Sequence, residues 1–375
     1  MSAVPTEAYG EEETMGIHVN GENGVVCRVP NCDFGYFGWP SIARLEDGTL
    51  IAGASGLRWG HICPWGKSVL SESHDGGKTW TEPHVVHDSP LDDRDVGVVA
   101  LGGRSVMITW FTLDSREFLA EYRRGMSGAV RSWMEGKVSA LDDQTVKAHK
   151  GSWTRLSTDG GKTWSAPRRA PVSAPHGPIL LKNGALLYAG KRFPEEDLRP
   201  VARDVAVCVS DDQGESWREI GALPCPRGYK WDEIHEAHPV ELADGALLCS
   251  LRVHEKDTIA TWLSRSTDGG ATWSDPVRLP CDGAPAHMLL HSSGVIVCVY
   301  GYRHEPFGQR ALLSRDGVTW SDELILRDDG LDGDLGYPAS VELPDGELLT
   351  VYYQRLPGDA KTSVLSTRWH LPEII

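Results

Sequence analysis

The sequence predicts an all-β protein, a six-bladed β-propeller built from four-stranded antiparallel blades. Two short turn motifs recur along the chain, one five times and the other six times. The 375 residues also include 41 glycines and 14 tryptophans, which repeated turns and packed repeats require. Turn motifs at regular spacing are typical of repeat architectures, and propeller blades are four-stranded sheets.

The first motif has the form Ser-x-Asp-x-Gly-x-Thr/Ser-Trp and indicates a tight hairpin turn. In such a turn the Asp side chain accepts backbone hydrogen bonds, a glycine supplies positive φ, and the Trp packs between neighbouring units. The five copies are Ser73–Trp80, Ser157–Trp164, Ser210–Trp217, Ser266–Trp273 and a shorter Ser314–Trp320. Five copies in order are strong evidence for a repeated unit.

The second motif is a glycine-containing turn with a short β-rich run on each side, which is typical of a hairpin. Its six copies are Asp47–Leu50, Gly102–Val106, Asn183–Leu186, Asp244–Leu247, Ser293–Ile296 and Asp345–Leu348. Each unit therefore reads as strand A, hairpin, strand B, loop, strand C, Asp turn and strand D.

Five Asp turns against six hairpins leave the last blade incomplete. After the last hairpin the chain offers only Thr362–Ser366 as a C-like strand before it ends. We predict that the N-terminal segment near Gly24–Cys27 supplies the missing outer strand. Closing the ring in this way removes two exposed sheet edges.

The spacing indicates one domain over residues 1–375, with a flexible tail over 1–16 and one insertion. Ser73 and Ser157 are 84 residues apart, whereas later Asp-turn serines are separated by 48 to 56 residues. The excess falls at about 116–147, between strands of the second blade, where apolar residues recur at helical spacing. We interpret it as a packed surface excursion, or alternatively as a lid or a dimer contact.

The net charge of −16 argues against a nucleic-acid partner. An acidic protein that binds an anion needs a local cluster of cationic side chains. No run of 18 apolar residues is present, so we expect no membrane partner. The acidic N-terminus lacks signal-peptide features and the eight cysteines lack metal-site spacing, so we expect a cytoplasmic protein with reduced thiols. Removal of a leader would imply secretion instead.

Alternating strand directions place the starts of the A strands and the ends of the B strands at one end of the ring. Counting back from each hairpin glycine gives Gly38, Asp95, His176, Glu236, His287 and Tyr337. Five of these six residues can exchange protons or form strong hydrogen bonds. The B-strand ends carry Arg58, Lys191, Arg252 and Arg303, and Arg310 lies early in a C strand. We therefore expect a site for an anionic ligand at this end.

The sequence resembles the sialidase (neuraminidase) superfamily over nearly its whole length. The Asp turns are similar to its Asp boxes, which support fold more than function. Glu236–Arg252 resembles the stretch from the catalytic Glu to a carboxylate-binding Arg, and Tyr337–Gly346 resembles the stretch that opens with the nucleophilic Tyr. The resemblance implies that Tyr337 attacks the anomeric carbon and that Glu236 takes the phenol proton.

The resemblance also implies that arginines hold the carboxylate of the sugar in bidentate fashion. Arg252 fits this role, and Arg58 matches a first-blade arginine that touches the sugar. For the remaining arginine we favour Arg310 because of its place before an Asp turn, with Arg303 as its rival. We also expect His176, His238 and His287 to bind the sugar.

The first blade departs from the superfamily pattern. Its Arg-Ile-Pro triplet is replaced by Gly38-Trp39-Pro40, and Arg28-Val29-Pro30 lies ten residues too early to take its place. The superfamily's acid/base Asp should follow Arg58, but the loop Trp59–Lys67 contains no acid.

Other residues are candidates for the missing functions of the first blade. His61 can serve as the general acid if its pKa suits the working pH. Asp95, which resembles a second-blade Asp of the superfamily, is the other candidate. Lys67 restores some of the positive charge.

These features predict an exo-acting, retaining glycosidase that cleaves a terminal sialic acid or a related 2-keto-3-deoxy sugar acid, so that its partner is an acidic sugar or a sialylated glycan. The alternatives are an inverting hydrolase or lyase on another acidic sugar, and a non-catalytic glycan-binding propeller. Retention of Glu236 and Tyr337 argues against the last. We expect no metal and no cofactor, because no ligand set has suitable spacing. The sequence carries no signal of oligomeric state.

Overall fold

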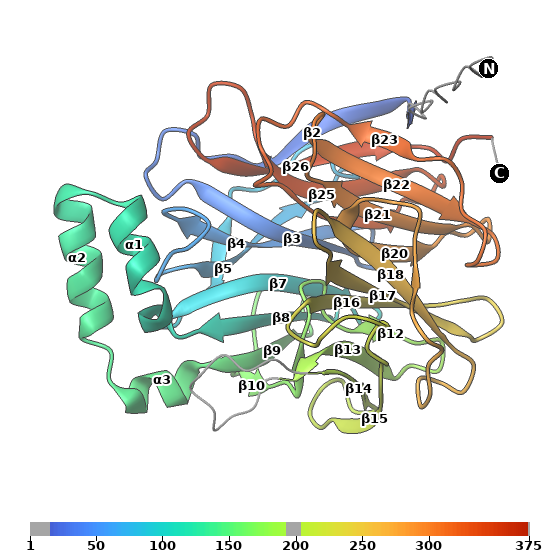
Figure 1. Cartoon of the computed structure of the whole chain (residues 1–375), viewed down its shortest axis with the longest axis horizontal. Coiled ribbons are helices and arrows are strands. Elements are labelled where there is room, and N and C mark those ends of the chain that lie inside the picture. The colour runs from blue at the N-terminus through green and yellow to red at the C-terminus, as the bar shows by residue number, and fades with distance from the viewer. Residues whose placement is uncertain (1–15, 193–203, 374–375) are drawn as a thin grey trace, which may run out of the picture.

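A computed structural model of the chain describes residues 16–192 and 204–373. Six antiparallel sheets follow one another around a ring, which makes the protein a six-bladed β-propeller, as predicted. Figure 1 shows the molecule from the side, with most strands running across the view. The predicted tail over residues 1–16 lies, apart from Gly16, outside the described residues.

The first three blades are contiguous in sequence. Blade 1 consists of β3 (Tyr36–Arg44), β4 (Leu50–Arg58), β5 (Lys67–Ser73) and β6 (His84–His87). Blade 2 consists of β7 (Asp92–Ala100), β8 (Val106–Leu113), β9 (Gly151–Ser157) and β10 (Arg168–Arg169). Blade 3 has an inner strand in two pieces, β11 (Val172–Ser173) and β12 (Ile179–Leu180), followed by β13 (Leu186–Arg192), β14 (Val205–Ser210) and β15 (Arg218–Ala222).

The last three blades complete the ring. Blade 4 consists of β16 (Ile234–Glu241), β17 (Leu247–His254), β18 (Ile259–Ser266) and β19 (Val277–Arg278). Blade 5 consists of β20 (Gly283–Leu290), β21 (Ile296–Tyr302), β22 (Gly308–Ser314) and β23 (Leu324–Arg327). Blade 6 consists of β24 (Gly336–Glu342), β25 (Leu348–Arg355) and β26 (Thr362–Trp369), with β2 (Gly21–Cys27) as its outer strand.

The two ends of the chain meet in the ring, which confirms the predicted closure. Strand β2 pairs antiparallel with β26, in a register that joins Gly21 to Trp369. The short strand β1 (Ile17–His18) adds in parallel to β23 at the edge of blade 5. Apolar side chains from β2 and from blades 1 and 6 share one core cluster, so the closing contact is buried.

The Asp turns are held by the hydrogen bonds that their sequence predicts. In the first copy the Ser73 hydroxyl donates to Asp75 at 2.8 Å, and Asp75 accepts from the backbone N–H of Thr79 at 2.9 Å and from its hydroxyl at 2.6 Å. The indole of Trp80 donates to the Gly77 carbonyl at 3.2 Å. These bonds fold the turn back onto its own blade.

Each Asp turn also packs against the preceding blade, which explains why the motif repeats. A Cβ on Gly77 would lie 2.6 Å from Leu349 of blade 6, and one on Gly214 would lie 2.5 Å from Met107 of blade 2. Gly317 approaches Leu248 of blade 4 in the same way. The glycine therefore permits both positive φ and close approach of neighbouring blades.

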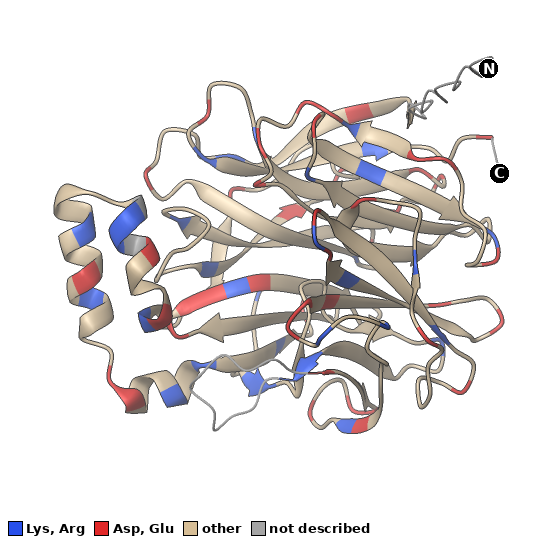
Figure 2. Ribbon diagram, viewed as in Figure 1, with Lys and Arg blue, Asp and Glu red and all other residues tan. Residues whose placement is uncertain are grey.

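The ring has two distinct ends. We call the end of the ring at which the A strands begin the upper end, and the end that carries the A–B hairpins the lower end. The A strands that begin at the upper end are β3, β7, β16, β20 and β24. In Figure 1 the upper end lies to the left, where β7 begins. Figure 2 shows acidic and basic residues alternating along the first part of β7. These are Asp92, Asp93, Arg94 and Asp95, all buried.

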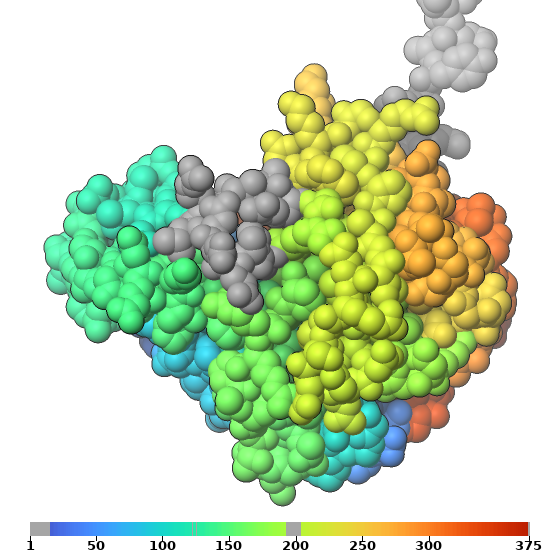
Figure 3. Space-filling view, turned by 90° about the horizontal axis from the view of Figure 1, so that it is seen from below, coloured from blue at the N-terminus to red at the C-terminus, as the bar shows by residue number. Residues whose placement is uncertain are grey.

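A helical segment stands beside the upper end, between β8 and β9. It consists of a 3₁₀ turn (Ser115–Phe118), α1 (Leu119–Gly125), α2 (Gly128–Ser139) and α3 (Asp143–His149). Figure 3 shows it standing out from the ring as a lobe. Met126, Met134 and Val138 pack with Cys63 and the two tryptophans of the loop after β4. The lobe therefore covers the loop in which the sequence lacks its expected acid.

Each of the eight cysteines is free, and six of them are buried. No helix in the described part of the chain is long and apolar enough to cross a membrane.

Candidate active site

Bulges in three A strands direct side chains toward the upper end. Trp39, Asp95 and Tyr337 each open a bulge and have φ of 52°, 55° and 50°. Such a conformation costs a non-glycine residue about 1–3 kcal/mol and persists at sites where its surroundings fix it. Counting along the sequence gave Gly38 as the blade 1 member of this ring, but the bulge gives that place to Trp39.

A phenol and a carboxyl group from different blades meet at the upper end. The hydroxyl of Tyr337, on β24, donates to Glu236 Oε1, on β16, at 2.6 Å. Arg252 Nη1, on β17, donates to both carboxylate oxygens at 3.1 and 3.2 Å and to the Tyr337 oxygen at 3.1 Å. The predicted meeting of Tyr337 and Glu236 is confirmed, with Arg252 beside them.

The surroundings of Tyr337, Glu236 and Arg252 determine which of these three side chains carries a charge. Burial opposes ionisation of Glu236, but Arg252 and the Tyr337 hydrogen bond outweigh it and lower the pKa of Glu236 to about 2. Burial and the Glu236 charge raise the pKa of Tyr337 well above its usual value. At neutral pH the proton therefore stays on the phenol, and the carboxylate is ready to accept it.

Arg303 provides a second guanidinium beside the phenol. Its Cζ lies 5.9 Å from the centre of the Tyr337 ring. The buried Nε atoms of Arg252 and Arg303 have no hydrogen-bond partner among the described residues. Both arginines thus carry a donor that is unsatisfied in the structure. Arg303 also lines a cavity of about 300 Å³ between blades 4 and 5, with His254, Lys256, Asp257, Asp282 and His304.

Asp95 is a buried acid near the pair. Its side chain is almost enclosed, and its Oδ1 has no partner within the described residues. Burial raises the pKa of Asp95 to about 7 despite the opposing charge of Arg94. The negative charge of Glu236 adds to this rise in the pKa of Asp95.

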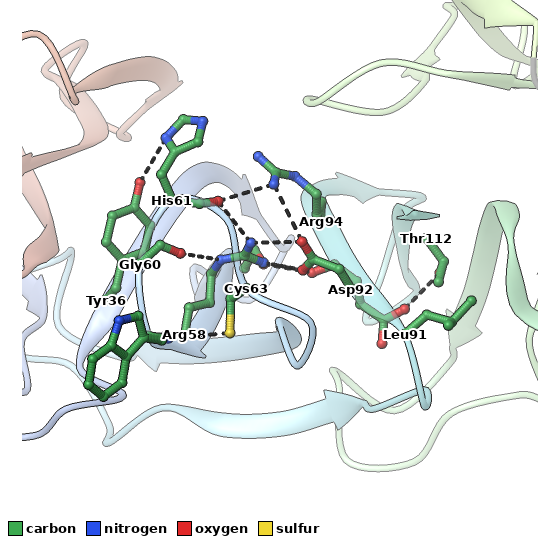
Figure 4. A network of polar contacts seen from close by, with 12 residues as sticks. Tyr36, Arg58, Gly60, His61, Cys63, Leu91, Asp92, Arg94 and Thr112 are labelled. Atoms are coloured by element: carbon green, nitrogen blue, oxygen red, sulfur yellow. Dashed lines mark hydrogen bonds and ion pairs between the residues drawn. The ribbon is translucent and has the colours of Figure 1, made fainter. Parts of the chain in front are cut away.

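His61 belongs to a second network, which is centred on Asp334. Asp334 Oδ1 accepts from His61 Nδ1 at 2.9 Å, from the Tyr36 hydroxyl at 3.0 Å and from the Tyr353 hydroxyl at 3.1 Å. Tyr36, Tyr353 and Tyr337 also share an aromatic cluster with Trp39. Figure 4 shows Tyr36 facing the His61 ring.

Arg58, in contrast, uses its donors inside the protein. It is fully buried and forms a bidentate pair with Asp92 of blade 2, at 2.6 and 3.0 Å. Its remaining donors reach the carbonyls of Gly60 and His61, as Figure 4 shows. Arg94 donates to the same His61 carbonyl at 3.1 Å and lies 4.1 Å above the Trp39 ring. Arg58 therefore holds the loop of His61, and its contact with a sugar stays a prediction.

Residues 112–350 match the family described as BNR repeat-like domain. The chain belongs to this BNR-repeat family, within the sialidase superfamily. Among its relatives, a sialidase of Micromonospora viridifaciens is 25% identical over 359 residues, which cover 84% of this chain and 49% of the relative. A sialidase of Bacteroides fragilis (strain YCH46) is 24% identical over 380 residues, which cover 92% and 63%. The chain thus spans between about half and just under two thirds of these relatives.

Solved structures share the fold of this BNR-repeat protein. A protein of unknown function from Dyadobacter fermentans DSM 18053 matches with a TM-score of 0.73 and 21% identity, covering 95% of this chain and all of that one. The Hadza microbial sialidase Hz136 matches with a TM-score of 0.63 and 20% identity, covering 94% and 69%. An α-L-arabinanase of Penicillium chrysogenum also matches, with a TM-score of 0.60 and 14% identity, covering 95% and 100%. At these identities the likeness shows the fold alone.

Two other cationic residues expected at the site of this BNR-repeat protein lie elsewhere. Arg310 is buried, and its donors are used within blade 5. It pairs with Glu323 at 3.2 Å and donates to the carbonyls of Arg327 and Pro306. Arg303, the rival in the sequence, is the arginine beside the phenol. Lys67 is paired with Asp88 on the outer part of blade 1.

The three histidines expected to bind the sugar form a buried stack below the pair. The His238 and His287 rings lie 4.3 Å apart, and His176 meets both edge-on at 5.5 and 5.2 Å. They line a cavity of about 420 Å³ that also contacts Arg44 and Lys182 near the A–B hairpins, so it opens at the lower end. Burial lowers the pKa of all three rings, which stay neutral. The structure thus places them away from the Tyr337–Glu236 pair, and their contact with a sugar stays a prediction.

Sequence reasoning missed Asp334 and its two tyrosine partners, as well as Arg94. Asp334 lies only three residues before Tyr337, so an acid just ahead of β24 was an available signal. In residues 16–192 and 204–373 no group of three or more His, Cys, Asp or Glu side chains is arranged to hold a metal ion.

Proposed function

We propose that this protein is an exo-acting, retaining glycosidase that releases a terminal sialic acid or a related 2-keto-3-deoxy sugar acid. The observation that carries the proposal is the 2.6 Å hydrogen bond from the Tyr337 phenol to the Glu236 carboxylate, with Arg252 bonded to both. A binding protein would have no need of a phenol joined to a buried base.

The substrate carboxylate would lie between Arg252 and Arg303. Both guanidinium groups have free donors, and an acidic protein needs such a local cationic pair to attract an anion. The polar cavity beyond Arg303 has room for other hydroxyl-bearing parts of the ligand. This binding would fix the anomeric carbon over Tyr337.

In the first step the Tyr337 oxygen attacks the anomeric carbon, and Glu236 accepts the phenol proton. The bond from that carbon to the leaving-group oxygen breaks, its electron pair goes to that oxygen, and a general acid protonates it. In the second step water attacks the same carbon and gives a proton to the conjugate base of that acid, while the bond to Tyr337 breaks. Glu236 returns the proton to Tyr337, and two inversions give net retention.

The electrostatics explain why the nucleophile is a phenol. A carboxylate on the anomeric carbon would repel a second carboxylate, whereas a neutral phenol meets no such repulsion. The raised pKa of Tyr337 keeps it neutral until Glu236 takes its proton. The sialidase names of the two curated relatives support the same class of substrate.

A trapping experiment tests the proposal. A 3-fluoro ulosonic acid fluoride should form a stable adduct on Tyr337, seen by peptide mass spectrometry, and Tyr337→Phe should form none. Labelling of another residue, or turnover without labelling, would reject Tyr337 as nucleophile.

The first-formed product separates the remaining reactions. For aryl glycosides of sialic acid and related sugar acids, NMR should show the retained anomer first. The inverted anomer would indicate an inverting hydrolase, and an unsaturated sugar would indicate a lyase. Binding without any product would indicate a glycan-binding propeller.

A further inference from the structure

The loop after β4 holds His61 firmly, although it contains no acid. Its His61 carbonyl accepts from both Arg58 and Arg94, at 3.0 and 3.1 Å. The helical lobe packs on the tryptophans and Cys63 of the same loop. The backbone that presents the His61 ring is therefore fixed from two sides.

The contact with Asp334 determines the tautomer of His61. An ionised carboxylate can only accept hydrogen bonds, so Nδ1, at 2.9 Å from Asp334 Oδ1, carries the proton. Burial opposes ionisation of Asp334, but the hydrogen bonds from His61, Tyr36 and Tyr353 outweigh it, so its pKa is lowered and the carboxyl stays ionised. In the neutral imidazole the lone pair is then on Nε2. That nitrogen has no protein partner among the described residues.

His61 stands close to the nucleophile and open to solvent. The Trp39 ring lies 5.0 Å from the His61 ring and 6.4 Å from the Tyr337 ring, so a single side chain separates the two. The His61 side chain is 49% exposed, whereas Asp95 is 7% exposed. A leaving group must depart into solvent, so its oxygen lies at the open side, where His61 stands.

We propose that His61, oriented by Asp334, is the acid–base catalyst that acts on the leaving-group oxygen. The inference rests on the proposed function and names a residue for the step that the first blade leaves unassigned. Asp334 is a positioning residue, because it acts through His61 and does not touch the reacting atoms.

The proton balance is complete with these groups. In the first step the imidazolium gives its Nε2 proton to the leaving oxygen as the glycosidic bond breaks. The neutral imidazole then takes a proton from the attacking water in the second step. Asp334 stays ionised throughout and accepts from Nδ1.

Several charged and polar groups face His61 and set its pH dependence. Asp334 and the Tyr36 hydroxyl face Nδ1, while Arg58 and Arg94 lie on the side of the loop backbone. Burial lowers the pKa of His61, Asp334 opposes this, and the two arginines add to it. We therefore expect kcat/KM for unactivated substrates to fall as pH rises through a value below the usual histidine pKa.

Leaving groups of different acidity provide the test. A sialic acid 4-nitrophenyl glycoside needs no protonation of its leaving group, whereas a sialyl-lactose does. The variants are His61→Gln, which keeps a side chain able to donate to Asp334, and Asp334→Asn. His74→Gln, at a lower-end Asp turn, is the matched control.

His61→Gln should lower kcat/KM for sialyl-lactose by roughly 100- to 10,000-fold and for the nitrophenyl glycoside by less than about tenfold. Azide should raise turnover of the nitrophenyl glycoside by His61→Gln, because it attacks without a base. Asp334→Asn should move the fall in kcat/KM with pH to lower pH, since the anion that favours the imidazolium is gone. His74→Gln should change none of these values.

Equal losses on both substrates in His61→Gln, with the pH profile unchanged in Asp334→Asn, would overturn the proposal. If Asp95→Asn alone then shows the leaving-group effect, Asp95 is the acid, and the Tyr337 mechanism stands. Failure of the wild-type protein to turn over any acidic-sugar glycoside would overturn the proposed function and this inference with it.

Discussion

The two sides of the upper end use their arginines in opposite ways. On the side of blades 4 to 6, Arg252 bonds the Tyr337–Glu236 pair and keeps an unpaired Nε. On the side of blades 1 and 2, Arg58 is fully buried and bound to Asp92. A guanidinium at the expected position therefore binds a ligand only if neighbouring acids and carbonyls leave its donors free.

The same contrast holds for acids. Glu236 has an arginine in direct contact and ionises readily, whereas Asp95 lacks such a contact and its pKa rises to about 7. Blades 1 and 2 thus provide Asp95, which is protonated below about pH 7, and the buried ion pair of Arg58 with Asp92. Blade 4 provides the charged pair of Glu236 and Arg252. Substitutions on the two sides should fail in different assays.

The largest effect is expected for Tyr337→Phe, on the reactive side. Loss of the phenol oxygen should lower kcat on the order of 10⁴-fold or more, with ligand binding retained by calorimetry. Tyr188→Phe, which removes a buried hydroxyl bonded to Ala174 in blade 3, is the matched control and should stay active. Turnover by Tyr337→Phe within tenfold of wild type would contradict the contrast.

Arg58→Met should act on stability instead. It leaves the buried Asp92 without its bidentate partner, which should cost about 3–5 kcal/mol of unfolding free energy in urea. The double variant Arg58→Met/Asp92→Leu should recover most of that loss. Arg252→Met should instead lower kcat/KM roughly 30-fold or more, from about 2 kcal/mol of lost binding. A raised KM in Arg58→Met with normal stability would break the comparison.

Asp95 should make stability depend on pH. Its folded pKa, about 7, lies above the unfolded value, so its contribution is complete at low pH and is lost as pH rises toward 7. Asp93, also buried with a pKa of about 7, acts in the same direction. Between pH 4.5 and 6.5, Asp95→Asn should reduce the slope of unfolding free energy by up to about 1.4 kcal/mol per pH unit. Identical slopes would show that Asp95 is ionised in the folded protein.

The smallest effect is expected for Lys67→Ala. The residue forms a partly exposed ion pair with Asp88, so its loss should cost less than about 1 kcal/mol in urea unfolding. The KM for an acidic glycoside should stay unchanged. A several-fold rise in KM would return Lys67 to the ligand site.

The fold and the reactive pair could be predicted because both depend on local patterns. The turns carry their own hydrogen-bonding residues, as Ser73 and Asp75 show. The stretches that begin at Glu236 and Tyr337 each place one side chain at the start of an A strand. Arg252 follows Glu236 by 16 residues, as the resemblance predicted, and lies near the end of the next strand, β17.

The rest depended on contacts that no local pattern records. Arg58 could not be seen as structural, because its partner Asp92 belongs to the next blade. Asp334 meets Tyr36 only across the closed ring, 298 positions away in sequence. The choice between Arg310 and Arg303 depended on their contacts, which loop length does not reveal. Arg310 donates to the Arg327 carbonyl, whereas Arg303 lies beside the Tyr337 ring.

The two strands whose pairing closes the ring, β2 and β26, are made at different times during synthesis. Strand β2 is made before blades 1 to 5 and its partner β26 only after them, so the pairing edge of β2 stays open while those blades are made. The sheet that β2 completes is the one that carries Tyr337. A chain that lacks β26 therefore cannot complete the blade that carries Tyr337, and we expect proteolytic removal of β2 to disturb the Tyr337–Glu236 hydrogen bond from a distance.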